Sequence, residues 1–121
     1  MKANFRTIGI KSLDEVLADA ANCMESIEQG DKVKKTSAYY FSSFEAFRKA
    51  MTPQRFSLLK VIREKRPDSI QSLATITGRD IKNISEDLKV LSSIDLIGIE
   101  QHGRSKAPHL KYSGIRFEVA L

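Results

Sequence analysis

The segment SIQSLATITGRDIKNISEDLKVLSSIDLI, residues 69–97, contains two helical patterns separated by only Thr77 and Gly78. In the first pattern, Ile70, Leu73 and Ala74 recur at helical spacing. Glycine readily adopts the left-handed conformation that ends a helix, so two short helices joined by a tight turn are predicted. The second helix spans about residues 80–93, and its predicted buried stripe consists of Ile81, Ile84, Leu88 and Leu91.

A third helix is predicted immediately upstream, over residues 53–65. Thr52 is a favourable N-cap residue, and it is followed by a proline at the first helical position, where proline costs no hydrogen bond. Pro67 ends this helix, because the residue before a proline disfavours the helical conformation. Asp68 or Ser69 then caps the next helix. The apolar side chains expected to face inward are Phe56, Leu58, Leu59, Val61 and Ile62.

Two alternating segments follow the helices, DLIGIEQ (95–101) and HLKYSGIRFEVAL (109–121). Alternation of apolar and polar residues is typical of half-buried strands, so the two segments predict a two-stranded ribbon linked by HGRSKAP, residues 102–108. Three helices followed by such a ribbon are the order of a winged helix-turn-helix domain, and we assign this α+β domain to residues 51–121. The apolar residues expected on its common side are Ile97, Ile99, Ile115, Phe117 and Val119.

Residues 1–50 are predicted to form an N-terminal strand and helix extension. NFRTIGI (4–10) has a strand pattern, and Ser12 with Glu15 forms a capping box that starts a helix of about 18 residues. An aromatic strand over 36–42 and one or two helical turns over 43–51 follow. The helix has an apolar stripe for which we expect a homodimer interface, the alternative being that it packs on its own domain. The stripe consists of Leu13, Val16, Leu17, Ala20, Met24 and Ile27.

The charge of the chain is uneven. Its 121 residues carry 20 Lys and Arg against 15 Asp and Glu, a net charge of +5. Residues 51–121 hold twelve of the basic and eight of the acidic side chains, so the excess lies in the C-terminal part. This balance suggests a polyanionic partner, although it also fits an ordinary basic protein.

Several other classes of protein are disfavoured. The longest apolar run is Ala38–Phe41, far short of the roughly 20 residues of a membrane helix, so a cytoplasmic protein without a membrane partner is expected. Cys23 is the only cysteine, which excludes an internal disulfide. His102 and His109 lack cysteine or carboxylate neighbours at metal spacing. No phosphate-binding glycine loop or catalytic combination of side chains is present, so no enzymatic activity, cofactor or metal is expected.

The 80–93 helix meets the requirements for reading DNA. A helix fits the major groove when one face packs on a scaffold and the other offers polar side chains to bases and phosphates. Alone, the polar face of this helix would be better explained as a solvated stripe of balanced charge. A second basic element favours DNA binding over that explanation, because Arg104 and Lys106 lie at the tip of the predicted ribbon. The outward residues of the helix are Lys82, Asn83, Ser85, Glu86 and Lys89.

Each of these side chains suits a particular contact. The amide of Asn83 suits adenine, and Lys82 suits guanine or a phosphate. Ser85 suits either kind of contact, and Lys89 suits a phosphate, as does Arg79 just before the helix. An acidic residue facing DNA is repelled unless it accepts from a cytosine amino group or pairs with a neighbouring base. For Glu86 we favour an ion pair with Lys82 or Lys89. Ser69, at the start of the first helix, is the last of the predicted DNA-binding residues.

These residues also carry a family resemblance. TPQRFSLLKVI, the 69–97 segment and the strands after it resemble prokaryotic winged helix-turn-helix transcriptional regulators. The elements TPxR…LL, SIxxLA and GRDxxNxxxDLxxL are similar to a family of small DNA-binding proteins of archaea and bacteria, over about residues 36–121. The resemblance implies DNA binding through the helix and ribbon residues named above. Many relatives have glycine where Asp95 stands, and aspartate tolerates the left-handed conformation less well than glycine, at modest cost.

The sequence therefore predicts two alternative functions. The first is a sequence-specific, double-stranded-DNA-binding transcriptional regulator, such as a repressor, that acts as a homodimer by occupying or leaving an operator. Some members of the resembled family are paired with a small toxin, which implies an antitoxin-like autoregulator. The alternative is a winged-helix module that binds a partner such as a toxin, with an incidental basic face. Steep salt dependence of duplex binding distinguishes the two functions.

Overall fold

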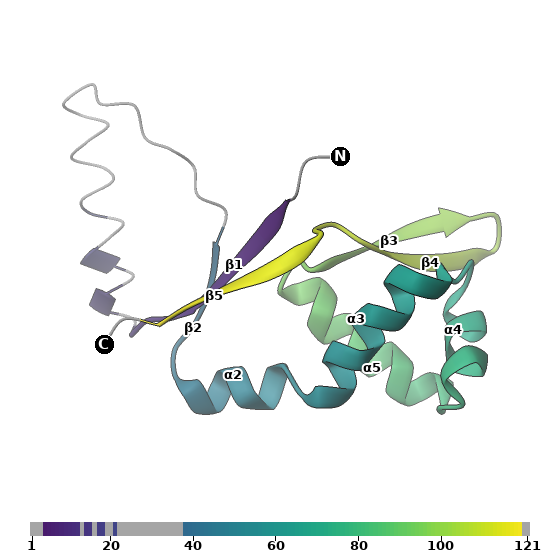
Figure 1. Ribbon diagram of the computed structural model, residues 1–121, viewed down its shortest axis with the longest axis horizontal. Helices are drawn as coiled ribbons and strands as arrows, with labels where there is room; N and C mark the ends of the chain where they lie inside the picture. The colour runs from purple at the N-terminus through teal and green to yellow at the C-terminus, as the bar shows by residue number, and fades with distance from the viewer. Residues whose placement is uncertain (1–3, 13, 16, 19–20, 22–37, 120–121) are drawn as a thin grey trace, which may run out of the picture. The chain divides into compact units, whose positions relative to one another are not determined.

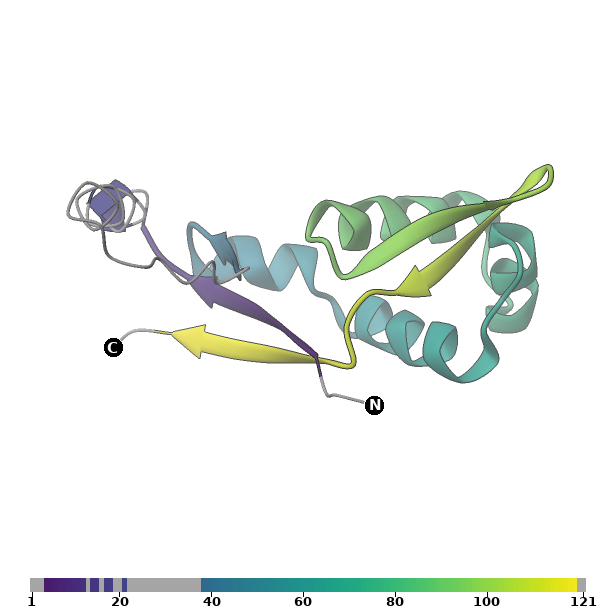
Figure 2. The ribbon, with the colours of Figure 1, turned by 90° about the horizontal axis from the view of Figure 1, so that it is seen from above.

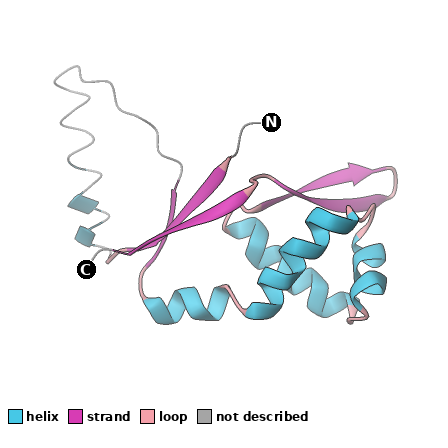
Figure 3. Ribbon diagram, viewed as in Figure 1, coloured by secondary structure: helices cyan, strands magenta, loops and turns pink. Residues whose placement is uncertain are grey.

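The computed structural model describes residues 4–12, 14–15, 17–18, 21 and 38–119. The protein is α+β, with helices and two separate sheets (Figures 1 and 3). It divides into two compact units. One consists of Ala50–Gly114 with Met1–Asn4, and the other of Phe5–Lys49 with Ile115–Leu121.

The first unit contains the three helices predicted from the sequence, α3 (Pro53–Lys65), α4 (Ile70–Thr77) and α5 (Ile81–Ser93). Their boundaries agree with the expected ones because the local signals act as predicted. The hydroxyl of Thr52 accepts from the Arg55 amide at 3.3 Å, and that of Ser69 accepts from the Ser72 amide at 2.9 Å. Gly78 ends α4 in the left-handed conformation, with φ 68°.

Packing of α5 differs from the prediction at one end. Ile84, Leu88 and Leu91 are buried as expected, but Ile81 is 47% exposed. Successive residues of a helix are rotated by about 100°, which places Ile81 at the edge of the buried arc. Asp87 lies at the opposite edge of that arc and is buried. The helix therefore packs with its Asp87 edge, rather than its Ile81 edge, against the rest of the unit.

The apolar residues of α3 are also less buried than predicted. Only Leu58 and Ile62 of this helix are buried, whereas Phe56 is exposed. These two residues are four positions apart and so lie one above the other on a single narrow face. Together with Leu73 of α4 and the buried stripe of α5 they form the core of this unit.

The ribbon consists of β3 (Ile97–His102) and β4 (Ser105–Leu110), which pair antiparallel in a separate two-stranded sheet. A strand does form within residues 109–121, as predicted, but its expected pairing with β3 was wrong. Gly103, with φ 61°, and Arg104 turn the chain directly after β3, so the partner strand begins within the segment predicted as a linker. Ile97 is buried, but Ile99 is 40% exposed rather than packed on the same side.

The second unit contains a three-stranded sheet in the order β2–β1–β5. Strands β1 (Phe5–Ile10) and β2 (Ala38–Phe41) confirm the two predicted N-terminal strands, and they pair in parallel. The C-terminal alternating segment forms β5 (Gly114–Val119), which pairs here and not in the ribbon. Helix α2 (Phe44–Ala50) follows β2.

Aromatic side chains pack on this sheet. Phe41 is buried, and Phe47 of α2 contacts both its ring and that of Phe117, with ring centroids 5.6 and 4.6 Å apart. Phe41 therefore belongs to a core, whereas Phe44 is 59% exposed.

The start of the N-terminal helix is confirmed. Residues 14, 15, 17, 18 and 21 are helical, and the Ser12 hydroxyl accepts from the Glu15 amide at 3.3 Å. Of the predicted dimerisation stripe, the structure describes only Leu17, which is 58% exposed. The other five residues of the stripe lie outside the described residues.

Candidate nucleic-acid interface

The polar face of α5 is accessible over its whole length. Lys82, Asn83, Glu86 and Lys89 are exposed, and Ser85 is half-buried. The 100° rotation per residue separates them: Lys82, Glu86 and Lys89 lie nearly opposite the buried arc, whereas Asn83 lies to one side of that line.

An open groove of about 680 Å³ runs between α5 and one face of the ribbon. Lys89 approaches it from the helix and Lys106 from the ribbon, so two residues distant in the sequence share one groove. Leu88 and Ile99 form part of its apolar floor. The polar side chains along it are Ser85, Lys89, Ser92, Ser93, Gln101 and Lys106.

The sequence analysis identified only half of these polar residues. Ser92 and Ser93 were not predicted because they lie at the end of α5 rather than at its start, and Gln101 was not predicted because it carries no charge. A usable signal existed, since Ser85, Lys89 and Ser92 are spaced i, i+4 and i+7 along one side of the helix.

The turn of the ribbon presents Arg104 as expected. The turn between β3 and β4 forms the free end of the ribbon (Figure 2). Arg104 directly follows Gly103 in this turn and is exposed. Asn83 does not line the groove. The predicted contact residues are therefore distributed over the groove, the exposed face of α5 and the ribbon turn.

The ion pair expected for Glu86 is not formed. Among the described residues, the salt bridges include none from Glu86 to Lys82 or Lys89. All three side chains are exposed, and pairing long exposed side chains gains little in water. The face therefore presents two cations and one anion, each open to solvent.

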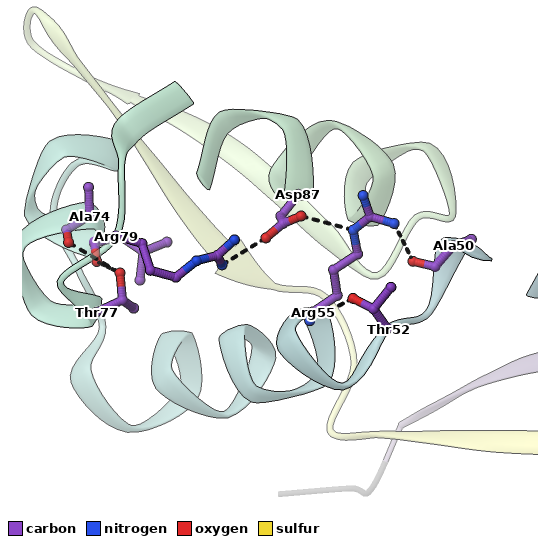
Figure 4. A network of polar contacts seen from close by, with 8 residues as sticks. Ala50, Thr52, Arg55, Ala74, Thr77, Arg79 and Asp87 are labelled. Carbon is purple, nitrogen blue, oxygen red and sulfur yellow. Dashed lines mark hydrogen bonds and ion pairs between the residues drawn. The ribbon is translucent and has the colours of Figure 1, made fainter. Parts of the chain in front are cut away.

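Asp87, the acidic residue next to Glu86, is buried and was not predicted. It is 7% exposed and accepts from two guanidinium groups (Figure 4). Nε of Arg55 donates to Oδ1 at 3.0 Å, and Nη1 of Arg79 donates to Oδ2 at 2.8 Å. Arg55 also donates from Nη1 to the carbonyl oxygen of Ala50 at 2.8 Å. One carboxylate thus fixes α5 to α3 and to the turn after α4.

This network changes the role expected for Arg79. Its Nη1 is already bonded to Asp87, and the side chain is only 25% exposed. A phosphate contact would have to use the remaining N–H groups of the guanidinium. Ser69 is similarly engaged, because its hydroxyl caps α4.

The HVO_A0114 family model matches residues 50–117, more than half of the chain, so the protein is a member of that family. Its description names no activity, ligand or partner. No curated protein matches the chain significantly.

Membrane-spanning helices and metal-binding clusters are both absent from the described residues. None of the helices in this part of the chain is both long and apolar enough to cross a membrane. Within the same residues, no three His, Cys, Asp or Glu side chains gather where they would hold a metal ion.

Proposed function

We propose that the protein is a sequence-specific regulator of transcription, in which α3–α5 and the ribbon form a winged helix-turn-helix that binds double-stranded DNA through α5 and the ribbon. The observation that carries the proposal is the groove shared by Lys89 of α5 and Lys106 of β4. Two cations on opposite sides of a groove lined by serine hydroxyls match a phosphodiester chain, which needs both charge and hydrogen-bond donors.

The remaining contacts follow from this placement. With a phosphodiester chain in the groove, the start of α5 lies in the adjacent major groove, which is about 12 Å wide and admits a helix. Lys82 and Asn83 then meet base edges, and Arg104 at the turn reaches the neighbouring minor groove or backbone. The Asp87 network holds α5 at a fixed angle to α3, so the helix meets the groove without first having to be ordered.

The test of the proposal is the salt dependence of duplex binding. Each phosphate contact contributes a log–log slope of about −0.9, so Lys89→Ala with Lys106→Ala should reduce the slope by about 1.8. Lys60→Ala with Lys65→Ala is the matched control. Both of these residues are exposed on α3, neither lines the groove, and the change removes the same charge. An equal change in slope for both pairs of variants would show that net charge alone causes the effect.

Base recognition requires a separate measurement. Asn83→Ala should lose roughly 1–3 kcal/mol at one base pair if its amide makes a bidentate contact, whereas Lys89→Ala should weaken all sequences alike. Binding profiles over a randomised duplex library distinguish these outcomes. Unchanged profiles for both variants would remove α5 from the proposal.

A second candidate is a module that binds a protein partner, such as the toxin implied by the family resemblance. The observation that favours it is a pair of exposed isoleucines beside the α4–α5 turn, Ile76 at 44% and Ile81 at 47%. Exposed apolar side chains near each other favour protein contacts over nucleic acid. Such a module would lack duplex affinity at low salt, so the salt titration decides between the two candidates.

We further propose that the protein acts as a homodimer through its N-terminal helix. Operators are commonly read as two half-sites about 34 Å apart, and a two-fold dimer presents two recognition helices at such spacing. Among the described residues of the helix, the exposed Leu17 supports this interface.

A further inference from the structure

The face of the ribbon turned away from the α5 groove lines a second hollow. Side chains alternate across a strand, so Ile99 and Gln101 line the α5 groove, whereas Glu100 and His102 line this cavity of about 690 Å³. The end of α3 forms its other wall. The cavity has the size of small-molecule sites in proteins, about 300–1,000 Å³.

The floor of the cavity is apolar and its rim is basic. Ile62, Pro67, Ala107 and Pro108 are buried beneath it. Arg63 and Arg66 stand at the rim, and among the described residues neither guanidinium forms an ion pair or hydrogen bond.

The other charged lining residues are largely engaged. Glu100 pairs with His102 at 3.2 Å, and Lys111 pairs with Asp95 at 2.5 Å. Asp68 is the remaining carboxylate at the rim. A ligand that meets both arginines must therefore also tolerate the nearby carboxylates of Asp68 and Glu100.

Arg66 has an unusual backbone conformation. It ends α3 in the left-handed region, with φ 44°, where glycine is preferred because it has no Cβ. Arginine at this position is strained, and residues held in such conformations cluster at ligand-binding sites. The strained residue here carries one of the two guanidinium groups at the rim.

His109 supplies a second indication. Its Nδ1 is buried and has no hydrogen-bond partner among the described residues, although in either tautomer this nitrogen needs a donor or an acceptor. The ring lines the cavity and lies over Gly98, where a Cβ would come within 2.5 Å of Cε1. A glycine thus makes room for a histidine whose polar atom lacks a partner.

We infer that this cavity binds a small amphipathic anion, an apolar body bearing a carboxylate or a phosphate. The acidic group meets Arg63 and Arg66, and the body covers the floor above Ile62 and Pro108. Guanidinium groups recognise both kinds of anion through paired N–H donors, so the two share one chemistry here.

Such a ligand would act on the ribbon. It contacts the ribbon face opposite the one that holds Lys106, and it joins that face to the end of α3. By the proposed function, occupancy would fix the ribbon and change duplex affinity. This step rests on the proposed function, whereas binding in the cavity does not.

The experiment is a titration of the full chain, without DNA, followed by ¹H–¹⁵N NMR. The probes are 2-naphthoate, 2-naphthyl phosphate and the cation 2-naphthylmethylammonium. One or both anions should shift amides of residues 63–66 and of residues 98–112 other than Pro108, and the cation should not. The anion that binds identifies the acidic group. Arg63→Gln with Arg66→Gln should weaken the affinity about tenfold, as expected for the loss of one charged hydrogen bond or more. Lys60→Gln with Lys65→Gln should not.

A second variant separates a binding role from a structural one. Arg66→Gly relieves the left-handed strain, so it should raise the melting temperature and yet weaken anion binding. Equal binding of the cation, unchanged affinity in the double glutamine variant, or no shifts at millimolar probe would each overturn the inference. The duplex titration is then repeated with saturating anion. Absence of duplex binding would refute the proposed function and leave the cavity result standing.

Discussion

Replacement of Asp87 by asparagine tests whether one buried carboxylate holds α5 in place. The carboxylate accepts a hydrogen bond from each of two arginines, at 3.0 and 2.8 Å. A hydrogen bond to a charged group contributes about 1.5–3 kcal/mol, and breaking a buried ion pair costs about 3–5 kcal/mol. The side chains of Arg55 and Arg79 are 18% and 25% exposed, so water partly replaces the lost partner. We expect the free energy of unfolding to fall by about 2–4 kcal/mol.

The measurement is urea unfolding followed by far-ultraviolet circular dichroism, with Glu86→Gln as control. Glu86 is the preceding residue, is exposed and has no ion pair among the described residues, so the same chemical change should stay within about 0.5 kcal/mol. Since domains are stable by only about 5–15 kcal/mol, the difference between the two variants is large. Equal effects of the two substitutions would refute the assignment of Asp87 as the residue that fixes the three helices.

Three further predictions concern other parts of the fold. Gly9→Ala should destabilise the three-stranded sheet by about 1–3 kcal/mol in urea unfolding, because its Cβ would lie 2.7 Å from the Tyr40 ring; a neutral effect would contradict this packing. Asp95→Gly should change the free energy of unfolding by less than about 1 kcal/mol, because the backbone strain relieved at φ 67° offsets the loss of the partly exposed ion pair with Lys111. A larger loss of stability would mean that the ion pair dominates. Leu17→Glu should convert a dimer to a monomer in light scattering and weaken duplex binding, and an unmodified protein that is already monomeric at micromolar concentration would exclude the dimer.

The parts of the fold that local chemistry determines could be predicted from the sequence. Helices α3 and α4 begin at residues whose side chains cap them, Thr52 and Ser69, and Gly78 ends α4. Each of these signals acts within three or four positions along the chain. Position 95 is similar: the family resemblance implies a glycine there, which favours the left-handed region, and Asp95 has φ 67°.

Pairings between distant residues could not be predicted in the same way. The alternation of residues 115–119 identifies a strand but not its partner, and Pro108 disguised the true second strand of the ribbon, because proline is unusual within strands. Burial of Asp87 depends on Arg55, 32 residues earlier, which a helical pattern does not reveal. Among the candidate site residues, the helix and turn positions were identified, whereas Ser92, Ser93 and Gln101 depend on how the ribbon lies beside α5.

Strand β5 has a consequence for the order in which the protein folds. It pairs with β1, although its neighbour Ser113 is 109 residues from Asn4 along the chain. A growing polypeptide therefore completes all three helices and the ribbon before the last strand of the N-terminal sheet has been made. Contacts of such long sequence separation form slowly, because the intervening loop must first be closed. The first strand to be synthesised, β1, is thus among the last to be paired on both sides. Until β5 is added, one hydrogen-bonding edge of β1 is open to strands of other nascent chains.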